Sequence, residues 1–116
     1  MDVENASAFA ERRRRLNELI LERAGLPTRR FFALDHDVYE DGALPKKTKE
    51  LLGLVASVVL RCDDCVKYHL GESVASGATA AEITEALGIA LIVGGSITIP
   101  HLRRAYEFLE SVEPNE

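Results

Sequence analysis

The sequence predicts an all-α protein of about six helices, and three observations support this fold class. Apolar residues recur at the three- and four-residue spacing of helices along most of the chain. Glycine, proline and turn-forming pairs interrupt this pattern at intervals, as expected between helices. The β-branched clusters at residues 55–59 and 97–99 lie inside helical patterns or beside helix-breaking residues, so strands are not indicated.

Residues 6–24 are expected to form the first helix, because an apolar stripe runs through them until Gly25 and Pro27 end the pattern. Four consecutive arginines occupy positions 12–15 of this helix, with several glutamates at helical spacing from them. Opposite charges at this spacing predict a surface that faces solvent or another subunit, rather than an anion-binding site.

Turn residues bound the second and third helices. Thr28 can cap a short second helix, which is expected to end before Asp41 and Gly42. Pro45 is acceptable in the first turn of a helix, because the nitrogen of a residue there makes no intrahelical hydrogen bond. The third helix is therefore expected over residues 46–60.

Three further helices complete the expected fold. Thr79 and Glu82 stand at the spacing of a capping box, in which each side chain bonds the backbone N–H of the other residue, so they mark a helix start. Glycine or proline separates this long helix from its neighbours. The three helices are expected over residues 62–76, from residue 80 to the glycine pair at 94–95, and over residues 102–112.

Length and composition indicate one ordinary globular domain over residues 1–116. This length is sufficient for a single hydrophobic core, and 47% of the residues are hydrophobic and 28% charged. The formal net charge of −5 argues against a nucleic-acid partner, because phosphates require a basic surface. Polar residues and glycines interrupt the apolar run at residues 83–100, so no membrane segment is expected. No signal segment is recognised at the N-terminus, and the cytoplasm is the expected compartment.

The chemistry of the chain is concentrated in Cys62, Cys65 and His69. On one helix these three side chains lie on the same face, with Cys65 and His69 as neighbours one turn apart. An adjacent imidazole or a helix N-terminus lowers the pKa of a thiol, which favours the reactive thiolate. In a cytosolic protein such a cysteine pair is more often catalytic or metal-binding than structural. The motif therefore predicts redox chemistry, and its spacing permits a reversible disulfide.

Glu50 is a candidate partner for this motif only if the chain reverses direction. In one unbroken helix it would lie about 18 Å from Cys62. A reversal between residues 60 and 63 would form a helical hairpin, in which a carboxylate at position 50 could hold the imidazole of His69 and pass protons. On spacing alone, the simpler interpretation of Glu50 is an acidic residue that complements the helix dipole.

Three segments together resemble the carboxymuconolactone decarboxylase superfamily, and within it the alkylhydroperoxidase D-like branch. They are residues 44–52, the Cys-Asp-Asp-Cys motif with the Tyr-His pair after it, and residues 77–83. The resemblance implies an all-helical fold whose helical hairpin carries the cysteine motif, and a homo-oligomer, commonly a trimer or hexamer. It also implies thiol-dependent reduction of peroxides. The matching site residues are Glu50, Cys62, Cys65 and His69.

One position departs from the best-known peroxidases of this branch. They have a histidine directly before the second cysteine, where this chain has Asp64. A carboxylate so close to Cys65 should raise the pKa of the thiol, unless it points into solvent. A solvent-facing acid at the start of the helix is the simpler interpretation of Asp64.

The predicted function is that of a thiol-dependent peroxidase or dithiol–disulfide oxidoreductase. A thiolate attacks the peroxide and becomes a sulfenic acid, and the second cysteine condenses with it to a disulfide. A dithiol or protein reductant must then reduce the disulfide. Cys65 is the predicted attacking thiol because His69 lies beside it, and Cys62 the resolving one, although a helix N-terminus would equally favour Cys62 as the thiolate. No cofactor and no metal ion are expected.

Two other functions compete with this prediction. The first is lactone decarboxylation, the activity of a branch of the superfamily that generally does without the cysteine pair. The second is a non-enzymatic metal site formed by Cys62, Cys65 and His69. Structural zinc needs four ligands, and only His36 and His101 remain as histidines to complete such a site.

Overall fold

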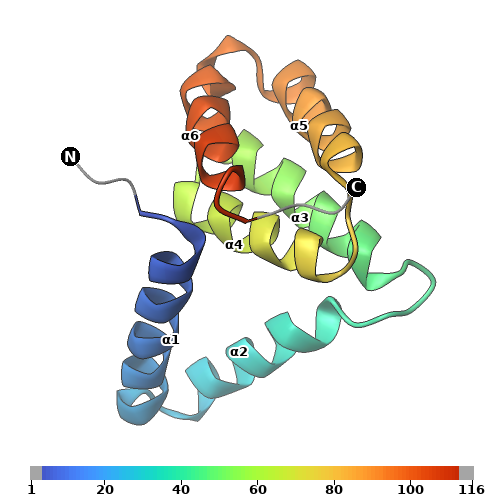
Figure 1. Ribbon diagram of the computed structural model, residues 1–116. Helices are drawn as coiled ribbons and strands as arrows, with labels where there is room; N and C mark the ends of the chain where they lie inside the picture. The colour runs from blue at the N-terminus through green and yellow to red at the C-terminus, as the bar shows by residue number, and fades with distance from the viewer. Residues whose placement is uncertain (1–3, 113–116) are drawn as a thin grey trace.

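The computed structural model describes residues 4–112, which form six α-helices and one short 3-10 helix (Figure 1). No strand occurs within this range, which confirms the predicted all-α class. None of these helices is both long and apolar enough to cross a membrane. The helices are α1 Ala6–Arg23, α2 Leu26–Val38, α3 Lys46–Val59, α4 Asp63–Ala75, α5 Ala80–Gly94 and α6 Ile99–Leu109, with the 3-10 helix η1 at Ser96–Thr98.

Two helices begin earlier than the sequence predicts, for the same reason. Helix α2 begins at Leu26, so Thr28 lies inside it and does not cap it. Helix α6 begins at Ile99, with Pro100 in its first turn rather than ahead of it. Pro27 occupies the equivalent place in α2. Proline fits there because its fixed φ is helical and its missing N–H would have no intrahelical partner.

The core of the protein lies among α3, α4, α5 and α6, with one contribution from α1. Figure 1 shows these four helices packed together, whereas α1 and α2 extend away from them. Phe9 of α1 reaches the core and meets the ring of Phe108 edge to face, with 5.7 Å between the ring centroids. The capping box at the start of α5 is present as predicted, since the side chains of Thr79 and Glu82 each accept from the other's backbone N–H.

Helices α3 and α4 form the predicted hairpin. The chain reverses at residues 60–62, where Arg61 adopts a φ of 60°, in the left-handed region that few residues other than glycine adopt. The backbone N–H of Cys62 donates to the carbonyl of Ser57, which ties the turn back to α3. The start of α4, which carries the cysteine motif, therefore lies beside the end of α3.

Candidate active site

Glu50 of α3 and His69 of α4 meet in the interior of the hairpin. Glu50 Oε1 lies 2.8 Å from His69 Nδ1. The glutamate is completely buried and the histidine is 8% exposed. The simpler interpretation of Glu50, as an acid that only complements the helix dipole, is therefore wrong. A carboxylate at this distance orients the imidazole and stabilises a proton on Nδ1, which leaves Nε2 to exchange protons with another group.

Gly53 makes room for the imidazole and was not recognised in the sequence. A Cβ atom at this position would lie 2.6 Å from Cε1 and 2.8 Å from Nε2 of His69. The helices can therefore approach closely enough for the contact between Glu50 and His69 only because residue 53 has no side chain. The available signal was a glycine in the middle of a helical pattern, where it is otherwise unfavourable.

We expect Gly53→Ala to displace His69 and to destabilise the protein, although alanine is the better helix former. The methyl group would overpack the site, which typically costs about 1 to 3 kcal/mol. The matched control is Gly71→Ala in α4, where a Cβ would meet nothing within 4 Å. That change should stabilise the protein by roughly 0.5 to 1 kcal/mol. Urea unfolding measures both effects, and a Gly53→Ala variant at least as stable as the wild type would contradict this account.

Two tyrosines flank the imidazole of His69. The ring centroid of Tyr39 lies 5.3 Å from that of His69, and the ring centroid of Tyr68 lies 5.0 Å from it. Burial raises the pKa of Tyr68 to about 12, and it also raises the pKa of Tyr39. Both side chains are therefore neutral phenols near neutral pH. Both rings therefore lie against the imidazole that meets Glu50.

Cys62 and Cys65 are joined by a disulfide at the start of α4, with 5.2 Å between their Cα atoms. Cys62 is the N-cap residue, and its sulfur accepts a hydrogen bond from the backbone N–H of Cys65 at 3.3 Å. Cys65 is exposed, whereas Cys62 is partly buried. The two sulfurs thus differ in access to solvent as well as in hydrogen bonding.

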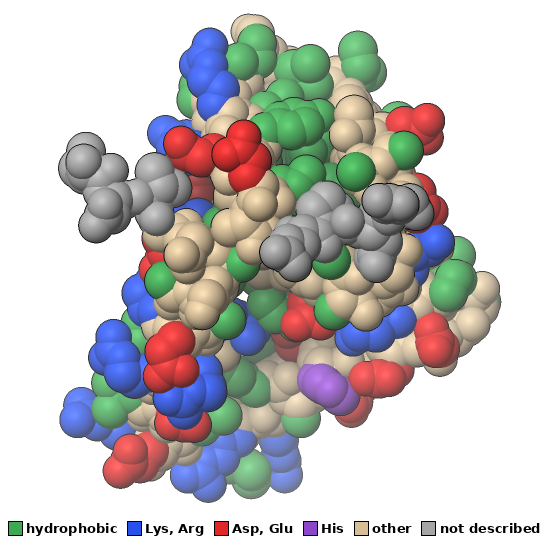
Figure 2. All heavy atoms as spheres, in the orientation of Figure 1, with side chains coloured by type: hydrophobic (Ala, Val, Ile, Leu, Met, Phe, Trp, Pro, Cys, Tyr) green, Lys and Arg blue, Asp and Glu red, His purple; other side chains and the backbone are tan. Residues whose placement is uncertain are grey.

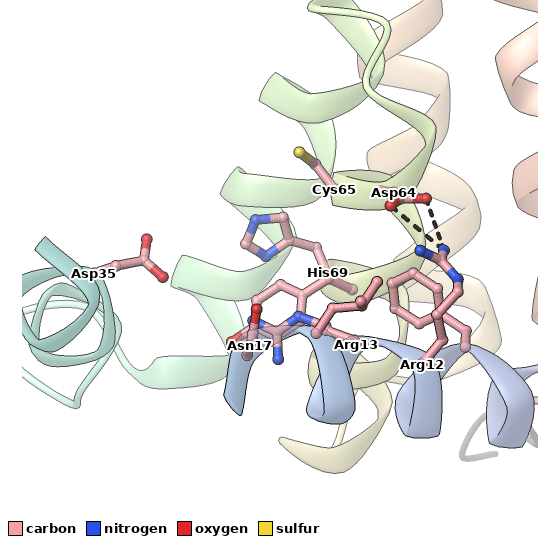
Figure 3. Close-up of a pocket in the computed structure, with 10 residues that line it drawn as sticks. Arg12, Arg13, Asn17, Asp35, Asp64, Cys65 and His69 are labelled. Carbon is pink, nitrogen blue, oxygen red and sulfur yellow. Dashed lines mark hydrogen bonds and ion pairs between the residues drawn. The ribbon is translucent and has the colours of Figure 1, made fainter. Parts of the chain in front are cut away.

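A cavity of about 340 Å³ opens beside Cys65 and His69, between α4, α1 and α2. Figure 3 shows both side chains directed to the same side of α4, with Asp35 reaching toward the cavity from α2. Its charged lining residues are Arg12, Arg13, Asp35 and Asp64. Cys62 is not part of the lining. A molecule in the cavity would therefore meet Cys65 and the imidazole of His69, but not Cys62.

Asp64 is 64% exposed but is paired rather than free. One guanidinium nitrogen of Arg12 lies 3.2 Å from its carboxylate (Figure 3). The same guanidinium bonds Glu4 at 2.7 Å, and this contact lowers the pKa of Glu4 to about 2. The positive charge of Arg12 offsets the effect that the Asp64 carboxylate would have on the neighbouring Cys65.

The arginine run of α1 serves two purposes, only one of which was predicted. Arg14 pairs with Glu11 and Glu18 on the surface, as the helical spacing indicated. Arg12 and Arg13 also line the cavity, which the interpretation of the run as a solvated or subunit-facing surface did not predict. The Arg13 guanidinium lies 3.9 Å from the centre of the Tyr68 ring. These contacts depend on how α1 packs on α4, which helical spacing does not reveal.

The remaining histidines lie outside this cavity's lining. His101 Nδ1 lies 2.7 Å from Asp63 Oδ1 at the start of α4, and His36 is exposed on α2. Within residues 4–112, no three histidine, cysteine, aspartate or glutamate side chains are placed to hold a metal ion. The thiols of Cys62 and Cys65 are joined to each other in this state.

Known proteins resemble this chain in sequence and in fold. The sequence model of the carboxymuconolactone decarboxylase family matches residues 26–108. Two crystal structures of a Thermotoga maritima protein, 65% and 64% identical to this chain, superpose with TM-scores of 0.86 and 0.84. Each alignment covers 88% of this chain and respectively 90% and 86% of theirs. One of them is described as a carboxymuconolactone decarboxylase family protein, for which a role in an antioxidative response has been suggested.

More distant relatives share the fold. A carboxymuconolactone decarboxylase family protein of Legionella pneumophila, in its apo form, is 31% identical, with a TM-score of 0.67 over 91% of this chain and 88% of its own. An uncharacterised protein of the Paracoccus denitrificans cox locus is 31% identical over 83 residues, which are 72% of this chain and 75% of that protein.

Proposed function

The chain belongs to the carboxymuconolactone decarboxylase family, and we propose that it is a thiol-dependent peroxidase that works by dithiol–disulfide exchange. One observation carries this proposal. An exposed sulfur, Cys65, lines a cavity together with His69, and the imidazole is held by the buried Glu50. The antioxidative role suggested for the Thermotoga maritima relative is consistent with this chemistry.

The first chemical step uses the reduced dithiol. With Nδ1–H donating to Glu50, His69 Nε2 accepts the proton of the Cys65 thiol. The thiolate attacks the terminal oxygen of a hydroperoxide, the O–O bond breaks, and the leaving alkoxide takes the proton from the imidazolium. The products are an alcohol and a sulfenic acid on Cys65.

The second step closes the disulfide. The thiolate of Cys62 attacks the sulfur of Cys65, the S–S bond forms, and hydroxide leaves and takes up a proton as water. In the bridged protein the two Cα atoms lie 5.2 Å apart, within the range of about 4.4 to 6.8 Å that a disulfide requires. An external dithiol then reduces the bridge by two exchange steps. The cytoplasm, the compartment expected from the sequence, would supply such a reductant.

The difference between the two sulfurs supports this assignment of roles. Cys65 is exposed and lines the cavity, where a peroxide has access to it. Cys62 is partly buried and accepts a backbone N–H, which favours its thiolate both as the resolving nucleophile and as the group released on reduction. The ion pair between Arg12 and Asp64 limits the unfavourable charge beside Cys65.

Peroxide consumption by the wild-type protein tests the proposal. Hydrogen peroxide and an organic hydroperoxide are supplied separately, each with a panel of small dithiols as reductants. We expect many turnovers per chain with at least one pair, and mass spectrometry of oxidised protein should show a loss of two hydrogens without a stable sulfinic acid. Consumption of a single equivalent of peroxide under every condition would refute a peroxidase function.

We also propose that the protein is a homo-oligomer, a trimer or a hexamer. Large apolar side chains are exposed on α5 and η1, among them Ile92, which is 84% exposed, Val93 and Ile97. Figure 2 shows hydrophobic side chains gathered over the region of α5 and α6, whereas charged ones gather over α1. An apolar surface of this kind is unfavourable in a monomer and is typical of a subunit interface.

Light scattering after size-exclusion chromatography decides the oligomeric state. The wild type should have the mass of a trimer or hexamer at micromolar concentration. Ile92→Lys should reduce the mass, because a charge would be buried in the interface, whereas Ile92→Leu should not change it. A wild-type protein with the mass of a monomer would show that these side chains do not form an interface between copies.

A further inference from the structure

The Glu50 carboxylate is hydrogen-bonded through one of its two oxygens. Its Oε1 meets His69, whereas the buried Oε2 has no hydrogen-bond partner among residues 4–112. The cation nearest to Oε2 in the ion pairs of the described chain is the ammonium of Lys46, at 3.5 Å. Lys46 lies one turn before Glu50 on α3, and its side chain is 32% exposed. It therefore connects a buried negative charge to the surface.

An isolated carboxylate in a protein interior is unfavourable unless a positive charge compensates it. Two cations can compensate Glu50: the ammonium of Lys46 or an imidazolium at His69. When Lys46 supplies the charge, the group of three is neutral with an uncharged imidazole. Without that charge, the group is neutral only when His69 binds a second proton.

We propose that Lys46 is a positioning residue that compensates the Glu50 charge and so keeps His69 uncharged and able to accept a proton from Cys65. Lys46 is not one of the residues that line the cavity. Its effect reaches the imidazole of His69 through the Glu50 carboxylate, and the imidazole in turn acts on the thiol of Cys65. The effect of Lys46 on the imidazole is inferred from the geometry alone. The importance of this effect for peroxide reduction rests on the proposed function.

The other ionisable groups around the imidazole do not replace Lys46. Tyr39 and Tyr68 are neutral near pH 7, because the ordinary pKa of a phenol is about 10 and burial raises it further. Across the cavity, Arg13 of α1 and Asp35 of α2 carry opposite charges, and Asp64 of α4 is already paired with Arg12. The adjacent thiol of Cys65 is the group on which the imidazole acts.

Lys46→Met tests the proposal, because methionine keeps an apolar stem and removes the charge. Loss of a positive charge favours proton binding by the groups nearby, so the pKa of His69 should rise by about one pH unit. The acid limb of the pH–rate profile for alkylation of reduced Cys65 should move to higher pH by a similar amount. NMR of histidine-labelled protein measures the first effect, with His69 assigned by its absence in His69→Ala.

Three further variants make the test specific. Lys46→Arg should titrate like the wild type, because it keeps the charge. Lys47→Met removes the neighbouring lysine, which pairs with Glu82 at 3.0 Å instead, and should leave His69 unchanged. Lys46→Gln serves as a second neutral substitution if the methionine variant fails to fold.

An unchanged His69 titration in the folded neutral variants would overturn the proposal, as would an equal shift in Lys47→Met. The titration does not depend on turnover. If the shift is found but the wild type consumes no peroxide, the role of Lys46 stands and the peroxidase function fails.

Discussion

Cys65→Ser is expected to reduce peroxide turnover to the background rate, the largest effect of any substitution considered. Serine keeps the size of the side chain but lacks an ionised nucleophile near neutral pH. Cys62→Ser should behave differently. It should react once with peroxide and then stop, because the sulfenic acid on Cys65 has no resolving thiol within the chain.

Mass spectrometry with a sulfenic-acid trap distinguishes the two variants. Cys62→Ser should gain one oxygen and bind the trap, whereas Cys65→Ser should do neither. The opposite pattern would assign the attack to Cys62, whose sulfur accepts a hydrogen bond at the start of α4. Equal reactivity of both single variants would contradict separate roles for the two sulfurs.

Glu50→Gln is expected to slow the oxidation of Cys65 by about 10² to 10⁴, the range typical of general acid–base groups. Glutamine has nearly the same shape, but its neutral amide cannot stabilise the imidazolium that forms as His69 takes a proton. His69→Ala should cause a similar defect, and the double variant should be little slower than either single one, since the two residues act as a unit.

Stopped-flow oxidation by peroxide, with thermal melts of each variant, provides the measurement. The matched control is Glu85→Gln on the exposed side of α5, which removes the same charge away from the site and should react normally. A Glu50→Gln variant that reacts at the wild-type rate but melts earlier would show that the carboxylate only stabilises the fold.

The elements of the fold were predictable because the signals for a helix are local. Apolar spacing, the glycines between helices and the capping box of Thr79 and Glu82 each depend on residues about four positions apart. The starts of α2 and α6 were misplaced by a few residues, because proline is compatible with the first turn of a helix as well as with the residues before it.

The candidate site was predictable only in part. Cys65 and His69 lie one turn apart on α4, so their common side followed from periodicity, whereas Cys62 is the N-cap residue of this helix and lies outside the cavity lining. Glu50 could be placed beside His69 only on the condition that the chain reversed, and resemblance to a family singled it out. The alternative that spacing alone favoured, an acid at a helix dipole, was wrong because burial cannot be deduced from position within a helix.

The sequence by itself thus determined the helices, their approximate limits and the order of chemical groups along α4, because these follow from contacts between near neighbours. Tertiary structure alone decided that Gly53 makes room for the imidazole, that Arg12 pairs with Asp64 and that the carboxylate which Lys46 pairs with is buried against His69. The contact of Gly53 with His69 and the ion pair of Arg12 with Asp64 each join two helices. Glu50 is buried because its side of α3 faces the core. All of them depend on the angle and separation at which the helices pack, which arise from the whole core rather than from any one segment.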